Sequence, residues 1–469
     1  MAKVRSVQCR WSAHTDYRNL LMLSAMSVLG GHVQRAIVMG GSYAGLFAAR
    51  VLSDYAEEVV VLEPDEIGQN GIGSRAPQRQ QLHALLAMGL AQLETWFPAI
   101  TQELVDAGAP LGEGDDVQFY VDDRLKAPVS GARMLGATRP FLEAHLRRRV
   151  TSLENVRILR LQVGGLVFDG DRVAGVVTAA PDGTRGEVID AGLVVDAMGR
   201  SSRLGSWLAQ HGWEGPATDR MHIDLGYATA TFQRGSELGG TVIAHSSPGP
   251  ASGYLPTLTE AGALAAVEGD RWSVVLAGYA HHRPGTDADA FLARMGRCVD
   301  PLRKVADNCS MIGDVKTFHF AAGQRRSFSR LRRFPGGLVV VGDALCSVNP
   351  VYGQGLTLAA LEANCLAAHL RSADSWRGPA MGYFRRAEAV ADAAWQISSI
   401  ADLAQPHVTG PYPAGYRLIR RMADMVTTAS VIDSGVNSVY MDVVNMVKHP
   451  RALSSPQVIG RAVRVLLAR

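Results

Sequence analysis

One segment near the start of the chain constrains its fold more than any other. A short strand-like segment at residues 34–39, apolar from Ala36 onward, leads into a glycine-rich turn, Gly40 to Gly45, and an apolar helical pattern follows to residue 52. A second apolar run, residues 59–62, ends in Glu63. This order of strand, glycine turn, helix, strand and terminal carboxylate is typical of the βαβ unit that binds dinucleotides. The sequence therefore predicts an α/β protein.

The residues of this unit have separate physical tasks. Gly40 allows the tight turn, and Gly45 lets the helix and the strand pack closely. The N-terminus of the helix would face the pyrophosphate, and Glu63 can accept two hydrogen bonds from an adenosine ribose. Ser42 stands where the pattern has its middle glycine, and its hydroxyl can donate a hydrogen bond to a phosphate.

A second motif follows about three hundred residues later. The apolar residues 338–341 are typical of a strand buried on both faces of a sheet, and Asp343 stands at its end. A loop with Asn-Pro and Gly-x-Gly, residues 349–355, then leads into an apolar helix that includes Leu356. Glycines at a helix entrance let backbone N–H groups approach a negatively charged group. By itself, this motif fits an ordinary turn as well as a ligand site.

A third segment repeats the theme of apolar strand, acid and glycine. Residues 193–195 are apolar, Asp196 ends the run, and Gly199 and Arg200 follow. In open α/β sheets, ligands bind at the carboxyl ends of the strands. We therefore expect this segment to reach the same end of the sheet as the other two.

The 469 residues are enough for two or three domains. We expect a discontinuous dinucleotide-binding domain at 33–212 and 332–385, because the three glycine motifs lie there. Strand-like runs separated by Gly, Pro and charged turns predict a mostly antiparallel second domain at 213–331. Residues 386–469 are expected to be mainly helical. Residues 1–32 are expected to be a non-essential N-terminal extension, because the fold signal begins near Val33. Their apolar stretch is too short to span a membrane, and Asp16 and the lack of a clear cleavage site argue against a signal peptide.

The composition excludes several classes of function. A net charge of +3 without a block of five basic residues argues against nucleic-acid binding. The five cysteines form no C-x-x-C pair, which indicates a reducing compartment and hence a cytoplasmic protein. No motif with metal-ligand spacing is present in the sequence, so we predict no metal site.

Taken together, the three glycine-containing segments resemble those of the single-component FAD-dependent monooxygenases related to para-hydroxybenzoate hydroxylase. They span nearly the whole chain in the order typical of that family, and the motif G-D-A-x-x-x-x-N-P-x-x-G-x-G, which begins at Gly342, is the most specific. Within the family, residues 77–86 and the helical C-terminus look most like actinobacterial enzymes of polyketide tailoring, including polyene epoxidases.

The resemblance implies a Rossmann-like FAD-binding domain, a mostly antiparallel β-sheet substrate domain and a helical C-terminal region. It implies that Asp343 bonds the ribityl or pyrophosphate part of FAD, that Gly353 to Gly355 face the flavin ring edge, and that Pro350 borders the ring. Arg139 and Arg79 would contact the flavin or its phosphates. The complete set of expected FAD-binding residues is Gly40, Gly41, Ser42, Ala44, Gly45, Glu63, Arg79, Arg139, Asp196, Gly199, Arg200, Gly342, Asp343, Pro350, Gly353, Gln354, Gly355 and Leu356.

The resemblance also implies a reaction. NADPH or NADH would reduce the flavin, O2 would add at C4a, and the hydroperoxide would pass one oxygen atom to a large, largely apolar substrate such as a polyketide. A dry pocket is required for this chemistry. The sequence does not identify which residue, if any, acts as a catalytic acid or base. Tyr227, Trp272, His281, His282 and Arg283 are available for substrate contact but are more typical of ordinary sheet or loop positions.

Other functions stay open at this point. Flavin halogenases carry a Trp-x-Trp-x-Ile-Pro motif, whereas none of the seven tryptophans here has another two positions away. A flavoprotein reductase or dehydrogenase would carry the same FAD motifs. The chain could also be a cyclase of natural-product biosynthesis that retains FAD structurally and merely folds its substrate.

Overall fold

The structure is a computed structural model, and the residues it describes begin at Val33. They are 33–67, 73, 80–180, 184–247, 260–371 and 376–468. The expected N-terminal extension, residues 1–32, and the expected FAD contact Arg79 lie outside the described residues. Among the described residues, no helix is long and apolar enough to cross a membrane.

A five-stranded sheet, in the order β18-β12-β1-β2-β8, forms the first layer of the fold. All four strand pairs are parallel. The central strands are buried because their runs of Val, Ile and Leu are covered on both faces. The strands are β1 (Val33–Met39), β2 (Ala56–Leu62), β8 (Val156–Leu159), β12 (Leu193–Asp196) and β18 (Leu338–Val340).

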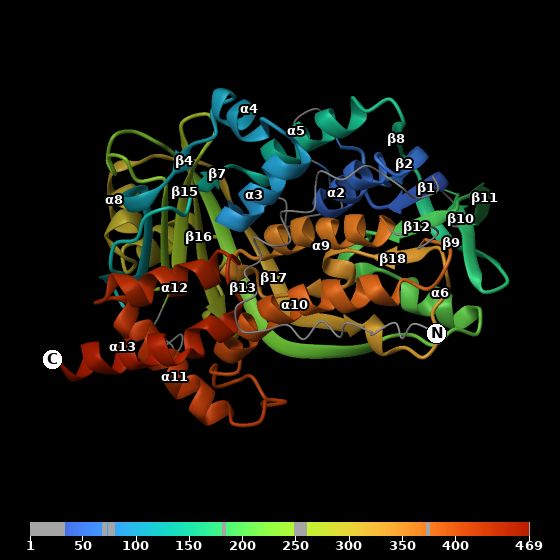
Figure 1. The fold of residues 1–469 in the computed structure, drawn as a ribbon. Helices are drawn as coiled ribbons and strands as arrows, with labels where there is room; N and C mark the ends of the chain where they lie inside the picture. Colours follow the sequence, from blue (N-terminus) through green and yellow to red (C-terminus); the bar gives the residue numbers. More distant parts are fainter. Residues whose placement is uncertain are drawn as a thin grey trace.

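Helices from distant parts of the chain cover this sheet. Helix α9 packs against α2, α3 and α10 and is buried along nearly its whole length, as Figure 1 shows between α2 and α10. Helix α5 begins after Thr138, whose hydroxyl accepts a hydrogen bond from the backbone N–H of Phe141. The helices are α2 (Tyr43–Leu52), α3 (Ala87–Trp96), α4 (Ile100–Asp106), α5 (Arg139–Thr151), α6 (Leu204–Gln210), α9 (Gly355–Leu370) and α10 (Met381–Asp402).

A second, eight-stranded sheet has the order β19-β17-β13-β16-β15-β14-β5-β6. Its pairs are antiparallel except for the parallel pair β14–β5. Helices α7 (Ala288–Met295) and α8 (Asp300–Asn308) share a hydrophobic core with it. The strands are β5 (Val117–Val121), β6 (Arg124–Leu125), β13 (Ala217–Gln233), β14 (Ile243–Ser247), β15 (Gly262–Val267), β16 (Arg271–Tyr279), β17 (Met311–Ser327) and β19 (Cys346–Ser347).

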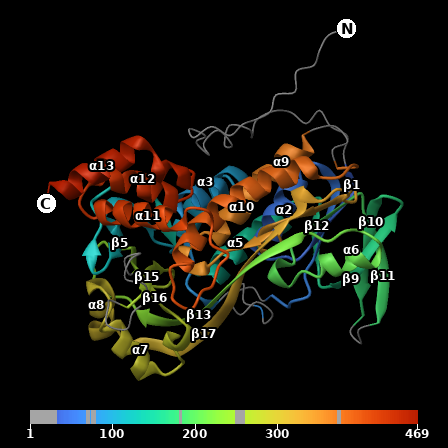
Figure 2. The same ribbon diagram turned by 90° about the horizontal axis from the view of Figure 1, so that it is seen from below.

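Two long strands connect the two sheets. Strands β13 and β17 have 17 residues each, and Figure 2 shows them running from the neighbourhood of α6 to that of β15 and β16. The end of β17 pairs with β19, which immediately precedes the loop at residues 349–355. The second sheet therefore holds that loop by backbone hydrogen bonds.

Two small antiparallel sheets complete the strand structure. One has the order β11-β10-β9 and the other β3-β7-β4. Their strands are β3 (Ala84–Leu85), β4 (Leu111–Gly112), β7 (Met134–Gly136), β9 (Gln162–Asp169), β10 (Arg172–Ala179) and β11 (Arg185–Asp190). The predicted fold class, a Rossmann-like part with a mostly antiparallel second sheet and a helical C-terminus, is confirmed.

The C-terminal helices α11 (Tyr416–Ser430), α12 (Ser434–Val444) and α13 (Pro456–Leu467) pack around a small core of their own. The division of the chain into domains stays a prediction, and several elements cross its boundaries. Strands β5 and β6 lie within 33–212 and β19 lies within 332–385, but all three belong to the second sheet, and α10 continues through residue 385.

Candidate functional site

A cavity of about 870 Å³ lies between the two sheets and the C-terminal helices. One side of it is built from the three glycine-containing segments, and we call this side the glycine wall. The other side is built from β5 and β13 to β17 with helices α10, α11 and α12, and we call it the sheet wall. The two walls meet at the loop of residues 349–355.

Backbone contacts hold the first and third segments of the glycine wall together. A Cβ atom on Gly40, which has φ +107°, would lie 2.6 Å from the carbonyl oxygen of Ala197. A Cβ atom on Gly45 would lie 1.9 Å from the carbonyl oxygen of Gly40. Such separations leave no space for a side chain, so the close packing expected of these two glycines is present in the structure.

The segment of Gly342 and Asp343 touches both of the others. Gly342 has φ +64°, and a Cβ atom added to it would lie 2.7 Å from the Cβ of Ala44 at the start of α2. A Cβ atom on Gly199 would lie 3.9 Å from the Cβ of Asp343. Three stretches that are far apart in the sequence therefore form one continuous surface.

The carboxylate of Glu63, at the end of β2, holds the glycine turn. It accepts hydrogen bonds from the backbone N–H groups of Gly41 at 2.8 Å and Asp65 at 2.9 Å. Glu63 is nearly buried but lines the cavity. Because each carboxylate oxygen can accept more than one hydrogen bond, Glu63 can still bind ribose hydroxyls.

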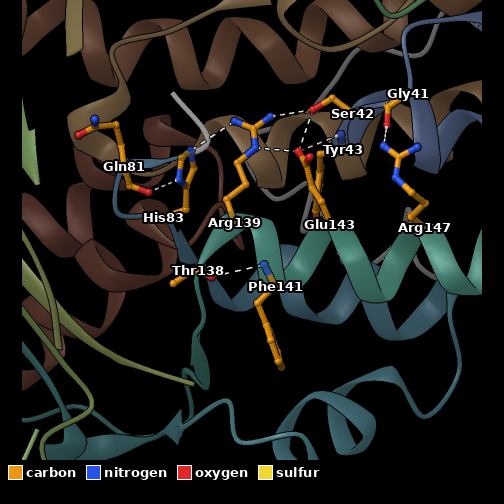
Figure 3. Close-up of polar contacts among 10 residues, drawn as sticks. All are labelled: Gly41, Ser42, Tyr43, Gln81, His83, Thr138, Arg139, Phe141, Glu143 and Arg147. Atoms are coloured by element: carbon orange, nitrogen blue, oxygen red, sulfur yellow. Dashed lines mark hydrogen bonds and ion pairs between the residues drawn. The ribbon is translucent and has the colours of Figure 1, made fainter. Parts of the chain in front are cut away.

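Arg139 reaches the N-terminus of α2 through a buried carboxylate (Figure 3). Its Nε donates to Glu143 at 2.8 Å, and its Nη2 donates to the Ser42 hydroxyl at 3.0 Å. Glu143 also accepts from the Ser42 hydroxyl at 2.7 Å and from the N–H of Tyr43 at 3.3 Å. Our sequence analysis missed Glu143, although its spacing of four residues from Arg139 on one helix is a recognisable signal.

His83 lies on the other side of Arg139 in the same close-up (Figure 3). One ring nitrogen contacts the carbonyl oxygen of Gln81 at 2.8 Å, and the other faces the Arg139 guanidinium at 3.3 Å. Burial lowers the pKa of His83 to about 3, and the charge of Arg139 lowers it as well. His83 is therefore neutral and hydrogen-bonded, as expected of a structural histidine rather than a catalytic one.

Arg139, Arg200 and Asp343 converge on the glycine wall. Burial raises the pKa of Asp343, and the nearby guanidinium groups of Arg139 and Arg200 oppose that shift. Arg200 stacks on the ring of Phe320 at 4.1 Å and donates one hydrogen bond to the carbonyl of Ala322. Its Nη1 is buried without a partner among the described residues.

The loop at residues 349–355 ends at an uncapped helix. Asn349 accepts a hydrogen bond from the N–H of Val351, and Gly353 has φ +67°. Helix α9 begins at Gly355, and no side chain of the described residues caps it. The position of a Cβ atom on Gly355 is open space, so the N–H groups of this first turn can approach a negatively charged group.

A buried carboxyl group supports this loop from below. Asp402 of α10 accepts hydrogen bonds from the Asn349 side chain at 2.7 Å and from the Tyr279 hydroxyl at 3.3 Å. Burial raises the pKa of Asp402 to about 7, and these two hydrogen bonds oppose the shift. The loop is therefore fixed by side chains from both the second sheet and α10.

The structure brings most of the predicted site residues to the cavity. Gly45 and Asp196 do not line it, since Gly45 packs inside the βαβ unit and Asp196 is fully buried. Gly41 does not line it either, and its N–H is bonded to Glu63. Those that line the cavity are Gly40, Ser42, Ala44, Glu63, Arg139, Gly199, Arg200, Gly342, Asp343, Pro350, Gly353, Gln354, Gly355 and Leu356.

Asp196 has a positioning role next to the cavity. Its carboxylate accepts hydrogen bonds from the Ser202 hydroxyl and from the N–H of Met198 at 3.0 Å. Burial raises the pKa of Asp196 to about 6. The turn that carries Gly199 and Arg200 is thus held by the acid that ends β12.

The sheet wall is mostly apolar, with contributions from Phe119, Ile243, Val275 and Phe318. Of the five substrate-domain residues singled out from the sequence, only Tyr227 lines the cavity. Within the described part of the chain, no group of three or more His, Cys, Asp or Glu side chains could hold a metal ion.

Comparisons with known proteins place this geometry in context. A family model described as "FAD binding domain" matches residues 33–394. The chain is 31% identical over 453 residues to "Protein Rv3254" of Mycobacterium tuberculosis (strain ATCC 25618 / H37Rv), covering 93% of this chain and 94% of that protein.

Solved structures share the fold at low sequence identity. The p-nitrophenol 4-monooxygenase PnpA from Pseudomonas putida DLL-E4 is 16% identical with a TM-score of 0.64, covering 90% of this chain and 100% of that one. The flavin-dependent brominase Bmp2 is 14% identical with a TM-score of 0.64, covering 93% and 99%. Both likenesses concern the fold alone.

Proposed function

Because the chain belongs to the FAD binding domain family, we propose that it is an FAD-dependent monooxygenase that acts on a large, largely apolar natural product such as a polyketide. It would insert one oxygen atom from O2, by hydroxylation or epoxidation, with NADPH or NADH as the electron donor. The resemblance to the single-component FAD-dependent monooxygenases holds for family and fold.

The observation that carries this proposal is the convergence of three distant segments on one cavity. Asp343, Arg139 and Arg200 lie close enough for the two guanidinium groups to affect the pKa of the carboxyl group. Two cavity-lining polar atoms, Arg200 Nη1 and Gln354 Oε1, are buried without partners among the described residues. FAD, which carries phosphates, hydroxyls and a polar ring edge, supplies partners for such atoms, so the site fits this cofactor.

The residues of the glycine wall would then bind and orient FAD. Asp343 would accept hydrogen bonds from ribityl hydroxyls, and Arg139 would neutralise negative charge at the phosphates or the ring. The N–H groups at the start of α9, from Gly355 onward, would stabilise negative charge on the ring edge. When bound, FAD supplies the hydride acceptance and O2 activation that the side chains of the protein cannot provide.

The sheet wall would hold the substrate and exclude water. Apolar side chains such as Ile243 and Phe318 face the cavity, and helices α10 to α12 close it. Exclusion of water protects reactive oxygen chemistry from side reactions. The apolar lining therefore supports an apolar substrate.

The test combines an absorbance spectrum of the purified protein with NAD(P)H oxidation in the presence of candidate polyketides and 18O2. We expect bound FAD, substrate-dependent NAD(P)H consumption and one labelled oxygen atom in the product. A colourless protein that cannot take up FAD would overturn the proposal. Product formation without NAD(P)H and O2 would instead support the FAD-containing cyclase considered from the sequence.

A further inference from the structure

A buried lysine lies in the sheet wall. Lys126 directly follows β6 and is only 6% exposed. Its ammonium group donates to the hydroxyl of Ser430 at 2.9 Å and lies 3.2 Å from the ring centre of Tyr440. No carboxylate in the described part of the chain forms an ion pair with it. Lys126 is therefore a buried amine with only neutral partners.

Lys126 belongs to a row of side chains across neighbouring strands. Its backbone N–H donates to the carbonyl of Phe119 at 2.8 Å, and Phe119 pairs with His245 in the parallel β5–β14 register. The rings of Phe119 and His245 are 5.4 Å apart, and all three residues line the cavity. The row thus places two nitrogen-bearing side chains on one stretch of the sheet wall.

His245 connects this row to the loop that borders the glycine wall. Burial lowers the pKa of His245 to about 4, the charge of Lys126 lowers it further, and a hydrogen bond to the backbone of Val351 opposes the shift. Val351 follows Pro350 in the loop. A ligand held by this row therefore lies beside the loop expected to face the flavin.

An unpaired buried cation is unfavourable unless something offsets its loss of hydration. The cavity lining includes the carboxylates of Glu63, Asp65 and Asp343, but none of them contributes to the pKa shift of Lys126, which comes from burial alone. Burial accordingly lowers the pKa of Lys126 well below its usual value. A negatively charged ligand in the cavity would reverse this effect, because each charge reduces the desolvation cost of the other.

We propose that Lys126, with His245 beside it, binds an acidic oxygen of the substrate, either a carboxylate or an ionised phenol or enol. This inference rests on the proposed function and narrows it, because the substrate becomes an apolar molecule with one acidic group. Lys126 supplies the opposite charge, and His245 supplies a second polar contact. The apolar remainder of the substrate lies along side chains such as Ile243 and Phe318.

The test measures binding to the FAD-loaded protein in the absence of NAD(P)H. Titration calorimetry would compare 2-naphthoate with its neutral analogue 2-naphthamide. We expect the wild type to bind naphthoate at least about 10-fold more tightly than naphthamide, because an ion pair in a dry site is strong. Lys126→Met should weaken naphthoate binding by about 10- to 100-fold and leave naphthamide binding nearly unchanged.

Two controls separate this role from other effects of the substitution. Lys304→Met, which removes an exposed lysine of α8, should leave naphthoate binding as in the wild type. Lys126→Arg, which keeps the positive charge, should retain a preference for the acid over the amide. The Kd for FAD of Lys126→Met should equal that of the wild type.

The inference is overturned if the wild type shows no preference for the acid, including the case in which neither probe binds. It is also overturned if Lys126→Met binds naphthoate as the wild type does, or if it loses FAD, since Lys126 would then serve the cofactor. These results are independent of the proposed oxygen chemistry. That proposal fails separately, if the FAD-loaded protein transfers no oxygen.

Discussion

The two walls of the cavity are built in different ways. The glycine wall consists of backbone turns in which a single Cβ atom on Gly40 or Gly45 would overlap with a carbonyl group. The sheet wall consists of side chains, and its lysine, Lys126, contacts Ser430, which lies 304 residues further along the chain. The difference teaches that a side chain added at Gly40 or Gly45 would displace backbone, whereas the sheet wall can be altered one side chain at a time.

The strongest challenge to this comparison is a substitution in the glycine wall. Gly45→Ala places a Cβ atom 1.9 Å from the carbonyl oxygen of Gly40, so the helix must move away from the strand. We expect a loss of unfolding free energy on the order of 3 kcal/mol and a protein that no longer retains FAD. Urea unfolding and the flavin absorbance of the purified variant measure both effects.

The matched control is Gly205→Ala in α6, where the added Cβ atom meets nothing within 4 Å. This variant should be as stable as the wild type or more stable by up to about 1 kcal/mol. If Gly45→Ala behaved like Gly205→Ala, the close packing described for the glycine wall would be wrong.

A smaller effect is expected from a polar side chain of the same wall. Asp343→Ala should weaken FAD binding by about 10- to 100-fold, because hydrogen bonds to a charged group contribute about 1.5–3 kcal/mol. The Kd for FAD can be measured from flavin fluorescence on titration of the apoprotein. A change below about threefold, within ordinary variation, would mean that Asp343 does not bind the cofactor.

A substitution in the sheet wall should raise the stability of the protein, whereas Gly45→Ala in the glycine wall should lower it. Lys126→Met removes a buried amine whose charged form is disfavoured by desolvation, and Ser430 keeps its hydrogen bond to the carbonyl of Thr427. We expect the unfolding free energy to rise by about 1–2 kcal/mol. Because the unfolded chain binds the lysine proton below pH 10.5, the gain should grow as the pH falls toward 7.

Urea unfolding at pH 7 and pH 9 measures this difference, with Lys304→Met as the exposed control that should change by less than about 0.5 kcal/mol. A loss of stability in Lys126→Met would show that the lysine is a structural element. The contrast between a glycine wall fixed by close packing and a sheet wall suited to an acidic ligand would then disappear.

The smallest expected change in stability comes from Asp402, which supports the loop where the two walls meet. The pKa of Asp402 is raised to about 7, so the folded protein holds a proton that the unfolded chain releases above its usual pKa of 3.8. The unfolding free energy should therefore fall by about 1 kcal/mol between pH 6 and pH 8. In Asp402→Asn this contribution is absent, while the amide oxygen can still accept from Asn349 and Tyr279.

The comparison requires urea unfolding at both pH values for the wild type, Asp402→Asn and the control Asp314→Asn, whose carboxylate is exposed. Asp314→Asn should keep the pH dependence of the wild type. An unchanged pH dependence in Asp402→Asn would mean that the buried carboxyl group is already ionised at pH 6.

The same contrast explains what could be predicted from the sequence. The tasks of Gly40 and Gly45 are local backbone requirements, and such requirements leave a recognisable pattern of residues. Predicting the hydrogen bonds of Glu143 would have required pairing it with Arg139, which lies four residues earlier on the same helix. No recognisable sequence pattern surrounds Lys126. Its environment comes from β5, β14 and two C-terminal helices, which only the fold brings together.

The strand pair β13–β17 has a consequence for how such a molecule can diversify. Because the two strands, 17 residues each, pair along most of their length with only two shifts of register, the distance between the two walls is constrained by covalent chain and backbone hydrogen bonds. A flexible linker would let that spacing drift whenever the substrate side changed. With this paired span, evolution or an engineer can exchange the lining of the sheet wall while its separation from the glycine wall is inherited unchanged.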